Sequence, residues 1–204
     1  MCELDDVRRQ TILDELRHAT RASHDRLEQR LDLLAQPADR DHFIAVLRGF
    51  LGFHRGFEPS LSHHGEFAGW LAERSRIAAL RADLTALGVD DAAIDDAPVC
   101  RAAAELTEDR ARTWGALYVI EGSTLGGQVI TRHLAGTPWL PAGGLRTFHP
   151  YGSQTGHMWN EFRACLVAAT TSLDPLDVTG GAVSTFSLLA EWLPTRSMNA
   201  QHRT

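Results

Sequence analysis

The stretch Trp114-Gly-Ala-Leu-Tyr-Val-Ile-Glu-Gly-Ser-Thr-Leu-Gly-Gly-Gln-Val-Ile130 decides the fold class of this chain. Apolar residues recur in it at helical spacing and no proline interrupts it, so we predict a helix. A glycine inside a helix costs about 1 kcal/mol relative to alanine, and this helix has three within six residues. Helical spacing gathers on one face Val119, Gly122, Ser123, Gly126, Gly127 and Ile130. Either another helix crosses closely over this nearly bare face, or a large flat molecule lies on it.

A second amphipathic helix is predicted over residues 10–35, with an apolar stripe formed by Leu13, Leu16, Thr20, His24, Leu27, Leu31 and Leu34. An imidazole in such a stripe is either hydrogen-bonded within the core or bound to a metal. Glu28 lies one turn after His24 and can hold the second ring nitrogen, as metal-binding histidines usually require. Arg17 lies two turns before His24, about 10.5 Å along the axis at about 1.5 Å per residue. This spacing suits a metal ligand and a cation for the acidic edge of a large planar cofactor.

Blocks of sequence along nearly the whole chain have the order and spacing of one known family. They are Leu16-Arg-His-Ala-Thr-Arg-Ala-Ser-His24, Tyr118-Val-Ile-Glu-Gly-Ser-Thr-Leu-Gly-Gly-Gln128, Tyr151-Gly-Ser-Gln-Thr-Gly156 with Trp159 and Phe162, and Thr185-Phe186 leading to Trp192-Leu193. The chain resembles the heme oxygenases, and most closely the bacterial branch associated with phytochromes. This resemblance implies an all-α single domain over residues 1–204, a helical bundle that holds heme between the N-terminal helix and a glycine-rich, kinked distal helix.

The resemblance also implies roles for individual residues. His24 matches the family's iron ligand, Glu28 the carboxylate that orients its imidazole, and Arg17 a basic partner of a heme propionate. The distal, catalytic side is expected to comprise Gly122, Ser123, Gly126 and Gly127. Three further residues are expected to contact the heme, namely Val119, Arg163 and Phe186.

Two positions depart from the pattern of the family. Many heme oxygenases have an acidic residue directly after the first distal glycine, where it organises water for proton delivery, whereas this chain has Ser123. A hydroxyl can still relay a proton through water. Mammalian-type relatives also carry several basic propionate contacts on the helix after the long loop, whereas Arg163 is the only arginine or lysine between residues 156 and 169. The meso carbon at which the ring would open is therefore left undecided.

The activity implied by the resemblance is degradation of heme b, which is both substrate and cofactor. Using O₂ and electrons from an external reductase or ferredoxin, the enzyme would release biliverdin, carbon monoxide and ferrous iron, and could supply a bacterial phytochrome with its chromophore. One alternative is a non-catalytic protein of the same fold that binds or sequesters heme. Another is a thiaminase-like hydrolase of similar architecture, which would need a catalytic cysteine. No cysteine here lies in a recognisable nucleophile motif.

Bulk properties exclude several other classes of protein. With 204 residues and a net charge of −6, the chain is long enough for one domain and is not expected to bind nucleic acid. No apolar run approaches the roughly 20 residues that span a bilayer, so no membrane segment is expected. Three widely spaced cysteines and an acidic N-terminus without a signal-peptide core favour the cytoplasm. Residues 1–9 and 195–204 are expected to fray.

Helical periodicity dominates the rest of the chain. Further helices are predicted over residues 42–58, 75–87, 99–106, 109–135, 156–172 and 178–193. Asp39 or Asp41 is expected to cap the first of these, and Asp177 or Thr179 the last. Residues 59–70 look irregular, residues 89–98 form an acidic connection, and residues 139–155 form a loop long enough to suggest a function. The adjacent pair His63 and His64 is expected at the surface, since neighbouring residues on a helix do not face each other.

Overall fold

The computed structural model describes residues 2–35, 38–141 and 145–196, with the side chains of residues 2–11 and of Ala68 left out. Within these ranges the chain is all-helical and has no strand. The α-helices are α1 (Cys2–Leu31), α2 (Arg40–Ser60), α3 (Gly65–Arg74), α4 (Ile77–Ala86), α5 (Asp91–Asp95), α6 (Arg110–Leu134), α7 (Thr155–Ala169) and α8 (Pro175–Trp192). Short 3-10 helices cover Leu61–His63, Arg101–Thr107 and Gly152–Gln154. The predicted fold class is confirmed.

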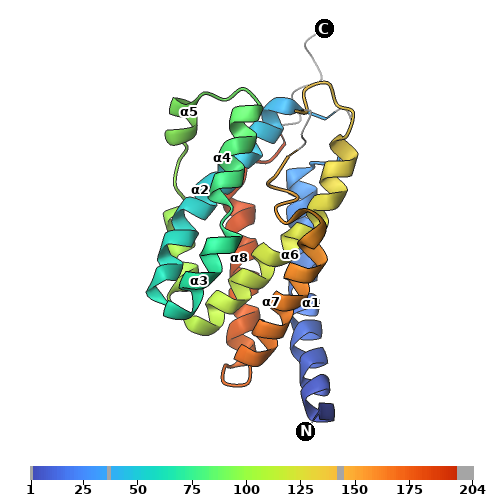
Figure 1. Ribbon diagram of the computed structural model, residues 1–204, viewed down its shortest axis with the longest axis vertical. Helices are drawn as coiled ribbons and strands as arrows, with labels where there is room; N and C mark the ends of the chain where they lie inside the picture. The colour runs from blue at the N-terminus through green and yellow to red at the C-terminus, as the bar shows by residue number, and fades with distance from the viewer. Residues whose placement is uncertain (1, 36–37, 142–144, 197–204) are drawn as a thin grey trace.

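Helix α8 is the centre of the bundle. It packs on α1 and α6 and also contacts α2, whereas α1 and α6 have little contact with each other in the described part of the chain. Figure 1 shows α2, α3 and α4 on one side of α8, and α1, α6 and α7 on the other. Helix α8 therefore separates α1 from α6, and both of these helices keep an exposed face.

Helix α1 buries the expected stripe only in part. Leu16, Leu27 and Leu31 are core residues, while Leu34 lies beyond the helix and is 48% exposed. The helix ends at Leu31, where Asp32 has a φ of +46°. Helix α1 extends from Cys2, ahead of the predicted start at residue 10.

Helix α2 supplies much of the aromatic core. Its N-terminus is capped as predicted by Asp39, whose carboxylate accepts bonds from the backbone N–H groups of Asp41 and His42. Phe43 and Phe53 are at most 2% exposed. No described helix is long and apolar enough to cross a membrane.

Several elements differ from the sequence-based expectation, among them α5, a short helix within the segment expected to be an acidic connection. Residues 65–74 form helix α3 where an irregular segment was expected, because its helical signal is short and interrupted by Gly69. Helix α8 begins at Pro175, three residues before the predicted start, and Asp174 caps it by accepting a bond from the N–H of Leu176. Aspartate followed by proline is a strong start signal, because proline at the first helical position lacks only an N–H that would be unpaired anyway.

Helix α6 is unbroken through Gly122, Gly126 and Gly127. Asp109 caps it through a bond from the N–H of Arg112, and the helix continues to Leu134. Its first half is buried on most sides, while its second half alternates between buried and exposed residues. The glycine-rich half is therefore the part of α6 that is open to a ligand.

Candidate functional site

His24 lies on α1, where its ring contacts helix α8. Its side chain is 51% exposed, and its Nδ1 lies 3.6 Å from a carboxylate oxygen of Glu28 and 3.9 Å from one of Asp25. Its ring meets the buried ring of Phe186 on α8 edge-on, with 5.7 Å between the centroids. Among the described residues, no group bonds to Nε2. The imidazole is thus oriented through Nδ1 and offers Nε2 to an incoming ligand.

The glycines of α6 have different surroundings. A Cβ at Gly126 would meet nothing within 4 Å, and one at Gly122 would make ordinary contact with the ring of Trp159 at 3.7 Å. A Cβ at Gly127 would lie 2.1 Å from the carbonyl oxygen of Phe148. The three glycines therefore do not share one face: Gly126 borders open space, while Gly127 lets the backbone of the following loop approach α6.

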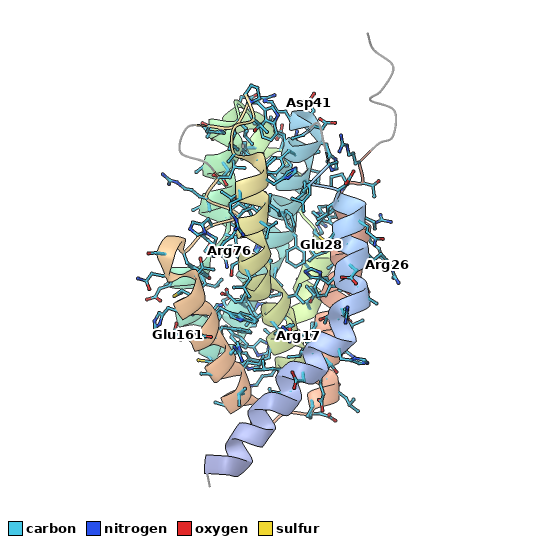
Figure 2. All side chains as sticks on the ribbon, turned by 90° about the vertical axis from the view of Figure 1, so that its right-hand side faces the viewer. Arg17, Arg26, Glu28, Asp41, Arg76 and Glu161 are labelled. Carbon is cyan, nitrogen blue, oxygen red and sulfur yellow. The ribbon has the colours of Figure 1, made fainter. Side chains whose placement is uncertain are left out.

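Two cations gather near the N-terminal half of α6. Arg17 of α1 and Arg163 of α7 are both exposed, and both are close enough to Tyr118 of α6 for their charges to act on its phenol. Burial raises the pKa of Tyr118, and the two arginines partly offset this rise. Figure 2 shows Arg17 and Glu28 on the α6 side of α1, whereas Arg26 points away from it. Helices α1, α6 and α7 thus bring two positive charges to one end of the exposed faces.

The sequence profile of the family described as Heme oxygenase matches residues 10–194. The chain belongs to the heme oxygenase family. It is also 41% identical over 99 residues to a protein named heme oxygenase from Xanthomonas campestris pv. campestris (strain 8004). That alignment covers 47% of this chain and 54% of the relative, so the chain spans about half the length of the curated protein it matches.

The exposed faces of α1 and α6 fit the chemistry of a heme. A half-exposed imidazole with a free Nε2 suits an iron ligand, and the open space beside Gly126 suits a flat ring lying against a backbone. Arg17 and Arg163 form a cationic end for the two carboxylates of the ring. Phe186 supplies an apolar contact beside the ligand.

Two residues expected to act in a heme oxygenase have less conspicuous surroundings. Val119 is only 6% exposed and packs in the main core, so it lies beneath the exposed face. Ser123 is exposed, and its hydroxyl donates a 2.7 Å bond to the carbonyl oxygen of Ile120 in its own helix. The neighbouring Thr124 is buried and bonds in the same way to Glu121. For Ser123 to donate a proton elsewhere, its hydroxyl must rotate away from this backbone bond.

Sequence reasoning missed a buried network on the opposite side of α6. Glu121 is 1% exposed, and its carboxylate contacts Arg74, Arg76 and Tyr151. A carboxylate at a core position next to Gly122 is the sequence signal that could have revealed it, since buried charges are almost always paired. In this member of the heme oxygenase family, α6 thus has an exposed side without side chains at Gly126 and a buried, charged side at Glu121.

Proposed function

We propose that this protein is a heme oxygenase that converts heme, with O₂ and electrons from a separate donor protein, into biliverdin, carbon monoxide and ferrous iron. The proposal depends on two faces that flank α8: His24 on α1 offers an unbonded Nε2, and Gly126 on α6 borders open space. A neutral histidine ligand suits this chemistry better than a thiolate, which favours early cleavage of the O–O bond.

The residues of the chain divide the work of binding and orientation. His24 binds the iron, and Glu28 fixes the tautomer and direction of its ring through Nδ1. Arg17 and Arg163 hold the propionates and thereby set the rotation of the ring, which selects the meso carbon that is attacked. Gly122 and Gly126 carry no side chain and would leave room on this face for a bound heme and for O₂.

Proton delivery would fall to Ser123. Ser123 has no charge, and its hydroxyl is bonded to its own helix. This observation favours a second candidate, a protein of the same family that binds heme without turning it over. A rotated Ser123 hydroxyl bridging to water would instead support turnover, because a hydroxyl is both donor and acceptor.

The deciding experiment adds hemin to the purified protein and then supplies ascorbate or a ferredoxin with its reductase. The proposal expects a histidine-ligated heme spectrum that is replaced by the spectrum of biliverdin, with carbon monoxide and chelatable ferrous iron as co-products. A stable histidine-ligated spectrum with no biliverdin would leave the binding protein as the function. Absence of heme binding would overturn both.

A matched pair of variants locates the reaction on the glycine face. Gly126→Leu fills the open space and should block turnover, while the helix itself is expected to gain up to about 1 kcal/mol of propensity. Leu125→Ala, at a neighbouring position that is 42% exposed, changes the helix surface without adding bulk and should leave turnover unaltered. Equal activity of the Gly126→Leu variant and the wild type would contradict the assigned face.

Partners and location are proposed on the sequence motifs and on the cysteines. The blocks shared with the phytochrome-associated branch support a bacterial phytochrome as recipient of biliverdin. Cys100 is buried and free, and Cys165 is exposed and free, which supports a reducing, cytoplasmic environment. Mixing the product-loaded protein with an apo-phytochrome and following assembly of the chromophore tests the transfer.

A further inference from the structure

The loop that follows α6 returns to lie against the glycine-rich half of that helix. The carbonyl oxygen of Phe148 takes the space that a side chain at Gly127 would need. Three residues later, the hydroxyl of Tyr151 donates to both carboxylate oxygens of Glu121, each at 3.0 Å. The loop therefore touches α6 on both sides of Gly122 and Gly126, from the face opposite the candidate heme site.

The contact at Glu121 is reinforced by two buried arginines. Arg74, the last residue of α3, lies 2.8 Å from one oxygen of Glu121, and Arg76, just before α4, lies 3.4 Å from the other. Arg76 also donates a 2.9 Å bond to the hydroxyl of Tyr151. All of these side chains except that of Tyr151 are at most 5% exposed. In Figure 2, Arg76 lies on the side of α6 that is turned away from α1.

The loop is itself held at its other end. Asp83 of α4 is 2% exposed, and its two carboxylate oxygens accept bonds from the backbone N–H groups of Arg146 and Thr147, at 2.9 Å and 2.7 Å. The buried carboxylates of Asp83 and Glu121, on α4 and α6, thus bind the two ends of a segment of seven residues, 145–151. A loop fixed in this way can transmit the position of α4 to α6.

We propose that residues 145–151 act as a strut that fixes the height of the glycine face of α6 above the heme. Glu121 and Tyr151 are its positioning residues. The inference rests on the proposed function and deepens it. Three glycines make this part of α6 intrinsically weak, and nothing packs beside Gly126 on the outer side. The position of this part of α6 must therefore depend on its contacts with the loop, which are made at Glu121 and at the backbone of Phe148.

Two variants loosen the strut without opening a cavity. Tyr151→Phe removes one hydroxyl and leaves Glu121 with both arginines, so the fold should persist. Glu121→Gln keeps the shape of the side chain and removes its charge. The matched control is Glu58→Gln, which neutralises another buried carboxylate that also contacts Arg76 but lies on α2, away from α6.

Hydrogen exchange of the heme-free protein is the first readout. Backbone amides of residues 121–127 should exchange about tenfold faster in Tyr151→Phe and Glu121→Gln, the factor expected for the loss of one strong hydrogen bond. In Glu58→Gln these amides should keep the same rate relative to the rest of the chain. The second readout is the ratio of biliverdin isomers, which should broaden in the two strut variants only.

The outcomes separate the strut from the proposed reaction. Local acceleration without any biliverdin, even from the wild type, would support the strut and overturn the enzyme. Unchanged exchange at residues 121–127, or acceleration that is uniform along the chain, would overturn the strut whatever the turnover. If Glu121→Gln does not fold, Tyr151→Phe decides alone.

Discussion

Two helices of this protein carry the same pair of residues in opposite surroundings. On α1, His24 and Glu28 are 51% and 67% exposed, with 3.6 Å between Nδ1 and the carboxylate. On α2, His54 and Glu58 are 9% and 8% exposed, with 3.0 Å between the same atoms. The spacing of four residues is identical, and in both pairs Nδ1 faces the carboxylate.

The difference lies in what surrounds each pair. Glu58 also accepts bonds from the hydroxyl of Ser75 and the backbone N–H of Arg76, so its carboxylate is fully used inside the fold. The carboxylate of Glu28 has no partner besides His24 in the described part of the chain. The buried pair therefore has a structural role, while the exposed pair is available to a ligand. Four comparisons between variants test this contrast.

The largest effect is expected for the histidines and heme ligation. His24→Ala should abolish the histidine-ligated heme spectrum and weaken binding by more than the roughly 10–100-fold typical of losing a partner of a metal-bound histidine. His54→Ala should retain ligation, because its imidazole is inside the core. Visible spectra of the hemin complexes, with exogenous imidazole added to rescue His24→Ala, provide the measurement. Ligation that survives in His24→Ala and disappears in His54→Ala would reverse the assignment.

The second effect concerns the stability of the heme-free protein. Glu58→Ala removes a buried carboxylate and leaves several donors unpaired, so it should lower the free energy of unfolding by about 3–5 kcal/mol. Glu28→Ala breaks an exposed contact and should cost about 0–1 kcal/mol. Urea unfolding followed by helical circular dichroism measures both. Similar losses in the two variants would show that the pairs are equivalent after all.

The third effect is on heme affinity in variants that keep His24. Glu28→Gln keeps the shape of the side chain but removes the charge that orients His24, so heme affinity should fall about 10-fold, at the low end for such partners. Asp25→Asn, at a carboxylate 3.9 Å from the same nitrogen, serves as the comparison and should have a smaller effect. Titration with hemin gives the affinities. An Asp25→Asn effect as large as that of Glu28→Gln would mean that either carboxylate can orient the ring.

The smallest effect is the dependence of stability on acid. Burial alone would raise the pKa of Glu58, but the contact with His54, together with bonds from Ser75 and Arg76, outweighs it and holds the pKa below the ordinary 4.5. The stability from this carboxylate is therefore present above pH 4.5 and lost as the pH falls through the folded-state value. The free energy of unfolding should be measured for wild type and Glu58→Gln between neutral and acidic pH. The difference between the two proteins should become smaller below pH 4.5. Ser75→Ala, which removes one of the bonds, should reduce this pH dependence without abolishing it.

Much of the fold is readable from the sequence, because helix signals are local. The glycine-rich helix and the Asp39 cap follow from spacing and capping chemistry within a few residues. Helix α3 was missed because its local signal is weak and tertiary packing stabilises it: Phe67 is buried against Trp114 of α6. The start of α8 was misplaced although the Asp174-Pro175 signal was present.

The sequence by itself determined that this is an all-helical chain of the heme oxygenase family, with His24 and Arg17 on one face of its first helix. The apolar stripe and the resemblance pointed to His24, but the spacing alone does not separate it from His54, because both have a carboxylate one turn later. Nor could the sequence show that Gly126 borders open space while Gly127 admits the backbone of Phe148. Only the tertiary structure decided these points, because burial and charge pairing depend on helices that are distant in the sequence.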